Sequence, residues 1–167
     1  MRKFLAAFIL LCVFVFGATA FKTDNSSAAY KPGTKIPAFV VENASGRVVI
    51  GETDAKYTLL LFWNSHDASA RIDCKHFDLL FKNNESLSSA CDFVAVNLDE
   101  SSVIFEEIVK CDALAPDNQF HVKAGHIDRV REIYHLAEGF NTVLLDSEGM
   151  IVALNPGAND IASLVVG

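Results

Sequence analysis

The chain has 167 residues, 51% of them hydrophobic, and a formal net charge of −7 at pH 7. This length suits one compact domain with a sizeable core. An acidic chain without a basic run is a poor candidate for binding nucleic acid or an anionic membrane surface. We therefore expect an unknown protein or small ligand as the partner.

The first 20 residues have the pattern of a secretory signal peptide. A short basic start precedes an apolar run over residues 4–16, and an A-x-A sequence ends at Ala20. This pattern predicts cleavage after Ala20. Cys12 lies in the middle of the apolar run, which does not suit a lipid attachment site. We expect a periplasmic or secreted protein with no membrane span after cleavage.

Residues 21–31 are rich in Ser, Ala, Lys and Asn and are predicted to form a flexible tail. Residues 32–167 are then predicted to form one domain. At its start, the Ser-Gly pair at 45–46 separates two short apolar runs at residues 39–41 and 48–50. This arrangement predicts an N-terminal β-hairpin.

Two later segments are continuously apolar: YTLLLFW at Tyr57–Trp63 and FVAVNL at residues 93–98. Solvent-facing strands alternate between apolar and polar residues, so these two are predicted to be innermost and parallel in a sheet of four or five strands. A helical pattern begins after Ala68. It is apolar over much of its circumference, which predicts a largely buried helix.

The second half of the chain alternates helical patterns with short strands. The complete pattern predicts an α/β fold, with a central mixed sheet and helices on both faces. The elements expected in this half are a helix to about Lys110 begun by Ser101 or Ser102, an extended piece at 120–122, a helix from Asp128 to Leu136 ended by Gly139, a hairpin of residues 142–145 and 150–154, and a helix over 159–166.

The segment FWNSHDASAR at residues 62–71 resembles a known active-site turn. Thiol-disulfide oxidoreductases of the TlpA/ResA type belong to the thioredoxin-like superfamily, as do AhpC/TSA-like redoxins. The TlpA/ResA proteins have F-W-x-[ST]-W-C-x-x-C-R here, with a Glu two residues later. In this chain the two cysteine positions hold Asp67 and Ala70. The matching residues are Phe62, Trp63, Ser65 and Arg71, with Asp73 as the acid.

A second resemblance covers residues 139–155, where relatives have a G-[VI]-P-T pattern whose proline is cis. The glycine and threonine are present, but the proline position is Asn141. A cis bond before a residue other than proline costs about 2.5 to 4 kcal/mol, so the Phe140–Asn141 bond is expected to be trans. The chain is similar to secreted thioredoxin-like proteins of Bacteroides-type bacteria. The resemblance implies a thioredoxin-like fold over roughly residues 31–165.

The absence of both cysteines removes the chemistry of the family. A carboxylate at Asp67 cannot attack a disulfide sulfur, and Ala70 cannot resolve a mixed disulfide. A peroxiredoxin would need its cysteine at the same position. Asp67 is predicted to cap the following helix by accepting a hydrogen bond from the N–H of Ser69 or Ala70. Alternatively, it is an exposed anion that recognises a partner together with His66.

Two functional hypotheses follow. The first is a non-enzymatic extracytoplasmic domain that holds a partner in the former substrate groove. The second is a thiol-disulfide oxidoreductase that works through Cys74, about two turns into the helix, where burial should raise the pKa of a thiol. We expect the protein to be a monomer. The expected groove residues are Trp63, His66, Asp67, Phe140 and Asn141.

Three cysteines follow the predicted signal peptide, an odd number for disulfide pairing. If a bridge forms, we expect it between Cys91 and Cys111. The helix after the strand at 93–98 should return Cys111 toward the start of that strand. Cys74 is expected on the opposite face of the sheet.

A metal site is not expected. Histidine precedes Asp67, as in the turn of copper-handling thioredoxin-like proteins, but those proteins bind metal through the cysteines that this chain lacks. The other histidines do not have metal-ligand spacing, and no cofactor motif is present. We therefore expect neither a metal nor a cofactor.

Overall fold

The computed structural model describes residues 30–43, 45–51, 54–136 and 141–167. The predicted signal peptide at 1–20 and most of the predicted tail at 21–31 lie outside the described residues. Within the described ranges, no helix is both long enough and apolar enough to cross a membrane.

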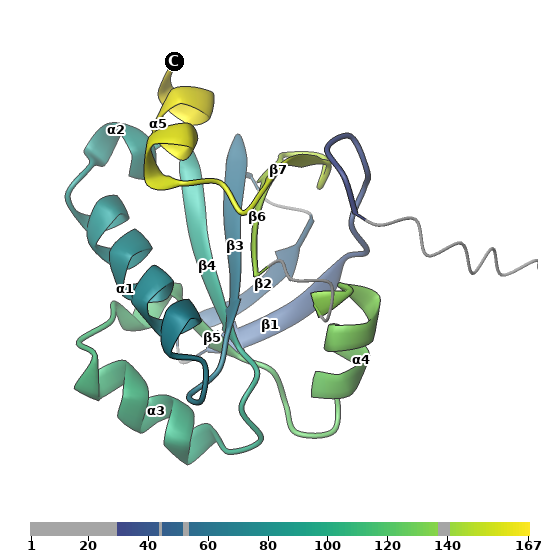
Figure 1. Ribbon diagram of the computed structural model, residues 1–167, viewed down its shortest axis with the longest axis vertical. Helices are drawn as coiled ribbons and strands as arrows, with labels where there is room; N and C mark the ends of the chain where they lie inside the picture. The colour runs from purple at the N-terminus through teal and green to yellow at the C-terminus, as the bar shows by residue number, and fades with distance from the viewer. Residues whose placement is uncertain (1–29, 44, 52–53, 137–140) are drawn as a thin grey trace, which may run out of the picture.

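Seven strands form one mixed sheet in the order β2-β1-β5-β4-β3-β6-β7 (Figure 1). β3 and β4 lie inside this sheet and are parallel, as their apolar character predicted. The sheet has more strands than the predicted four or five because β1 pairs with β5 and thereby adds the predicted hairpin. The strands are β1 (Phe39–Asn43), β2 (Gly46–Ile50), β3 (Tyr57–Trp63), β4 (Cys91–Asn97), β5 (Gln119–His121), β6 (Thr142–Asp146) and β7 (Ile151–Leu154).

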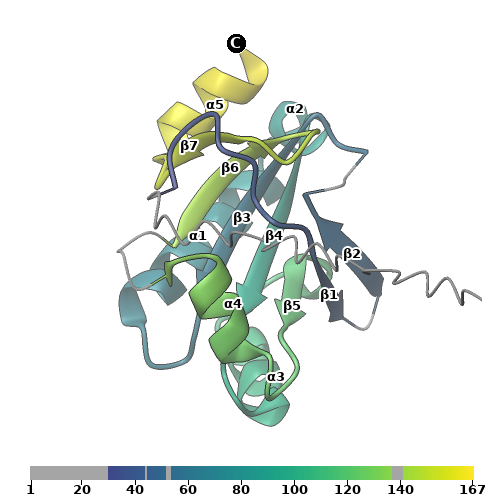
Figure 2. The same cartoon turned by 90° about the vertical axis from the view of Figure 1, so that its right-hand side faces the viewer.

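The predicted helices on both faces of the sheet are confirmed. Side chains from α1, α2, α3 and α5 share one core cluster, and α4 packs with the N-terminal segment in the other. Figure 2 shows α4 in front of the sheet and α1 behind it. The helices are α1 (Ala68–Lys82), α2 (Glu85–Ser88), α3 (Ser102–Cys111), α4 (Ile127–Ile133) and α5 (Ala158–Val166), with a short 3-10 turn, η1 (Pro116–Asn118).

The prediction that Cys74 lies on the opposite face from the helix ending at Cys111 is wrong. Cys74 of α1 and Val109 of α3 belong to the same core cluster. The chain moves from β3 to β4 to β5 in one direction across the sheet. Two successive right-handed crossovers in that direction place both helices on one face.

The structure also corrects two predicted features of the helices. α4 begins one residue before the predicted cap Asp128 and ends before Leu136, because His135 has a left-handed φ of 49°. Gly139, predicted to end this helix, lies outside the described residues. α1 is less buried than predicted, since Ile72 is 68% exposed and Leu79 is also exposed.

The N-terminal segment is bonded to the second half of the chain. The backbone N–H of Ile151 donates to the carbonyl of Thr34 at 2.9 Å. The hydroxyl of Tyr30 donates to the carbonyl of Ile133 at 2.6 Å. β1 also pairs with β5, through Glu42 and His121. Residues 30–50 are thus held by three separate elements that come later in the sequence.

Candidate functional site

The candidate site begins at the turn between β3 and α1. The side-chain oxygen of Asn64 accepts hydrogen bonds from the N–H groups of His66 and Asp67, each at 3.0 Å. Asp67 in turn caps α1 by accepting from the N–H of Ala70 at 3.0 Å. The predicted cap is present, so a carboxylate occupies the helix start at the position of the first cysteine in the TlpA/ResA pattern.

A buried carboxylate fixes this turn from the sheet side. Asp99, just after β4, accepts hydrogen bonds from the backbone N–H of Ser65 at 3.0 Å and from its hydroxyl at 2.9 Å. Asn97 donates to the same carboxylate at 2.8 Å. Sequence reasoning missed Asp99, although parallel β3 and β4 bring their carboxyl ends together at one sheet edge.

A cavity of about 290 Å³ opens beside the turn. Three of the five predicted groove residues, Trp63, Asp67 and Asn141, line it. His66 does not line it and is exposed. Phe140 lies outside the described residues. The other lining residues are Phe62, Asn64, Leu98, Arg131 and Leu136.

Asn141 is held at the mouth of this cavity by its backbone. Its carbonyl accepts the N–H of Phe62 at 2.7 Å. Its own N–H donates to the side-chain oxygen of Asn155 at 3.1 Å. These bonds fix the start of β6 against the end of β3. The peptide bond to Phe140 involves a residue outside the described ranges, so its trans geometry stays a prediction.

The walls of the cavity are apolar, and its mouth carries one group of each charge. Phe62, Trp63 and Leu98 supply apolar surface, while Asp67 and Arg131 are the charged residues. Arg131 contacts the carbonyl of Leu98 at 3.5 Å. No described lining residue carries a thiol, and no group of three or more potential metal ligands occurs in the described ranges.

No family model and no curated protein matches this chain. Solved structures do match it. A thioredoxin-like protein from Parabacteroides distasonis ATCC 8503 is 27% identical, with a TM-score of 0.67 over 80% of this chain and 93% of that chain. The chain has a thioredoxin-like fold.

Two further solved structures have the same thioredoxin-like fold. A thiol:disulfide interchange protein from Bacteroides sp. is 22% identical, with a TM-score of 0.70 over 83% of this chain and 92% of that chain. The thioredoxin domain of a thiol-disulfide oxidoreductase from Bacteroides vulgatus is also 22% identical, with a TM-score of 0.68 over 81% and 96% of the two chains. The predicted resemblance to thioredoxin-like proteins of Bacteroides-type bacteria is confirmed.

None of the three described cysteines lines the cavity. Cys74 is fully buried in α1, and its thiol contacts the side-chain oxygen of Gln119 at 3.5 Å. Burial raises the pKa of Cys74 to about 12. Burial likewise raises the pKa of Cys91 to about 12. Such thiols are almost wholly protonated at neutral pH and are poor nucleophiles.

The tentative bridge between Cys91 and Cys111 is not formed in the structure, where all three described cysteines are free. Cys91 is buried at the start of β4 and packs into the core cluster beneath α1 and α2. Cys111 is exposed at the end of α3. The two side chains therefore lie in different environments.

Arg71, which matches the family motif, has a structural role here. Its guanidinium binds the carboxylate of Asp112 in three contacts of 2.8 to 3.0 Å. Lys75 and the buried Asp78, on the same face of α1, hydrogen-bond backbone groups within residues 113–115. These three side chains join α1 to the loop after α3.

Substitutions of Asp67 test its role as the cap of α1. Asp67→Ala should lower the free energy of unfolding by about 1 kcal/mol, because the helix start loses its acceptor. Asp67→Asn retains an acceptor oxygen and should cost less than half as much. Urea unfolding followed by circular dichroism measures both. An equal loss in the two variants would show that the negative charge, rather than the hydrogen bond, stabilises the helix.

Proposed function

We propose that this protein is an extracytoplasmic thioredoxin-like domain that binds an extended apolar polypeptide segment without catalysing thiol-disulfide exchange. The observation that carries the proposal is the apolar cavity beside a turn that has Asp67 and Ala70 in place of both cysteines. The signal peptide expected at residues 1–20 supports an extracytoplasmic location.

The absence of exchange chemistry follows from the residues at the start of α1. Thiol-disulfide exchange requires a thiolate that attacks sulfur and forms a mixed disulfide. Neither Asp67 nor Ala70 has a sulfur atom. The relocated-cysteine alternative needs Cys74, whose burial and raised pKa argue against it.

The retained cavity supports binding. Apolar walls with a few polar groups at the mouth are typical of recognition sites, because burial gives affinity and polar groups give orientation. Asp67 and Arg131 can each pair with a polar group of a bound chain, while Trp63 and Leu98 contact its apolar side chains. Polypeptide is favoured over a small ligand because the cavity, at about 290 Å³, lies just below the usual range of volumes for small-molecule sites.

The test uses the insulin B chain with its cysteines carboxymethylated, so that binding cannot involve exchange. Trp63 is the only tryptophan of the chain and lines the cavity, so its fluorescence should change saturably on binding. Leu136→Asp in the cavity wall should weaken binding at least tenfold. Leu164→Asp, at an exposed position on α5, is the matched control and should not. Absence of a saturable change would contradict the proposal.

With dithiothreitol as the reductant, intact insulin should be reduced no faster in the presence of the protein than in its absence. A thiol titration of the folded protein should leave Cys74 unmodified. Turnover that disappears in Cys74→Ser would instead establish the relocated-cysteine enzyme. Turnover that survives Cys74→Ser would contradict both hypotheses.

A further inference from the structure

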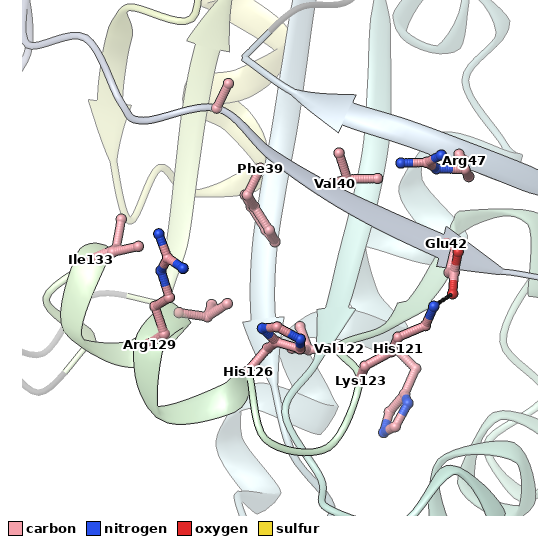
Figure 3. Close-up of a pocket in the computed structure, with 12 residues that line it drawn as sticks. Phe39, Val40, Glu42, Arg47, His121, Val122, Lys123, His126, Arg129 and Ile133 are labelled. Carbon is pink, nitrogen blue, oxygen red and sulfur yellow. Dashed lines mark ion pairs between the residues drawn. The ribbon is translucent and has the colours of Figure 1, made fainter.

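A second cavity, of about 340 Å³, lies between α4, β5 and the N-terminal hairpin (Figure 3). α4 contributes to both cavities with different residues, since Arg131 lines the groove whereas Arg129, Val130 and Ile133 line this second site. None of the residues lining one cavity lines the other. The second cavity is therefore a separate place for a ligand.

The interior of the second cavity is apolar. Val130 is buried in the core cluster, and the half-buried Phe39 and Ile133 pack against that cluster. Figure 3 shows Phe39 and Val40 between Arg129 on one side and Arg47 on the other. A ligand in this position would cover apolar surface in its middle and meet guanidinium groups at its edges.

The cavity is basic although the chain as a whole is acidic. Its permanent cations are Arg47, Lys123 and Arg129, and Glu42 is its single carboxylate. Lys123 is paired with Glu42, and this contact lowers the pKa of the Glu42 carboxyl. Arg47 and Arg129 do not form an ion pair with any residue in the described ranges. Arg129 is exposed and available to an added anion. Arg47 is also exposed, but it lies opposite Glu42 in the β1–β2 ladder and helps to lower the pKa of that carboxyl.

We propose that this cavity binds a small amphipathic carboxylate. The apolar part of the ligand lies against Phe39, Val130 and Ile133, and its carboxylate is bound by Arg129 or Arg47. A guanidinium can donate two parallel hydrogen bonds to a carboxylate, which favours this anion. A bare phosphate would leave the apolar interior uncovered. The volume lies at the lower end of the range for small-molecule sites.

Octanoate is the probe. Titrated into the 15N-labelled protein, it should shift the amide signals of Phe39, Val40 and Ile133 saturably, with a Kd of about 1 mM or tighter. Octanol lacks the charge, and acetate and inorganic phosphate lack the apolar chain, so each should bind at least tenfold more weakly. Raising the salt concentration from 0.05 to 0.5 M should weaken octanoate binding, because exposed charges are screened.

Two substitutions test the cationic groups. Arg129→Gln and Arg47→Gln should together weaken octanoate binding at least tenfold, and both side chains are exposed, so the fold should be retained. Lys110→Gln on α3 removes the same charge away from the cavity and should leave the Kd unchanged. Equal binding of octanol and octanoate, an unchanged Kd in the double variant, or shifts confined to the groove residues would each overturn the proposal.

Discussion

Raising the pH from 9 to 11 should lower the free energy of unfolding by about 4 kcal/mol through two buried thiols. Burial raises the pKa of Cys74 and of Cys91 from 9.0 to about 12 in the folded protein. A thiol whose pKa is higher in the folded than in the unfolded protein stabilises the folded state. This stabilisation is complete at pH values below the unfolded pKa, which is near 9. That stabilisation is lost as the pH rises toward 12, by about 1.4 kcal/mol per pH unit for each thiol. Urea unfolding at several pH values measures the loss.

Cysteine variants isolate this effect from other groups. Cys74→Ala should remove about half of the thiol contribution, whereas Cys111→Ser, at an exposed position, should leave the pH dependence unchanged. Burial also raises the pKa values of Tyr30 and Tyr134, so their ionisation at high pH lowers the free energy of unfolding as well. The difference between the cysteine variants is therefore the informative quantity. An identical pH dependence in Cys74→Ala and the original protein would refute the prediction.

Trp63→Ala should destabilise the protein by about 3 to 5 kcal/mol, because it opens a large cavity at the end of a central strand. Trp63 is 1% exposed, and its ring lies 6.1 Å from that of Phe105 between centroids. Its indole nitrogen is buried and has no hydrogen-bond acceptor among the described residues. Urea unfolding followed by circular dichroism measures the loss, because the substitution removes the only tryptophan fluorescence.

Trp63→Phe is the matched comparison. It keeps one aromatic ring but removes the second ring of the indole together with a donor that lacks a described partner, so it should leave a smaller cavity and cost less than Trp63→Ala. A loss as large as that of Trp63→Ala would contradict this prediction. Both variants should also weaken polypeptide binding in the groove, with the larger effect in Trp63→Ala.

The features that could be predicted from the sequence depend on local patterns. The continuously apolar runs identified β3 and β4 as inner parallel strands, since only strands covered on both faces have that composition. Asp67 was predicted as a cap because carboxylates at helix starts accept backbone N–H groups. Trp63, Asp67 and Asn141 were brought together by a family motif, and the structure places all three at one cavity.

The features that could not be predicted depend on how distant elements pack. Leu98, just after β4, and Arg131 of α4 line the groove, and no spacing in the sequence relates them to Trp63. The seven-stranded sheet depends on the pairing of β1 with β5, at Glu42 and His121. The shared face of α1 and α3 depends on the direction in which strands are added to the sheet.

The attachment of residues 30–50 to later elements has a consequence for the order of folding. Tyr30 bonds to a residue 103 positions later in the chain. Contacts of such long range close large loops and form slowly. A polypeptide that is synthesised or exported from its N-terminus presents this segment long before its partners in β5, α4 and β7. Until the hairpin docks, the outer edge of β5 is unpaired and open to strands of other molecules. Docking of the hairpin therefore covers β5 and leaves β2 as the edge strand on that side of the sheet.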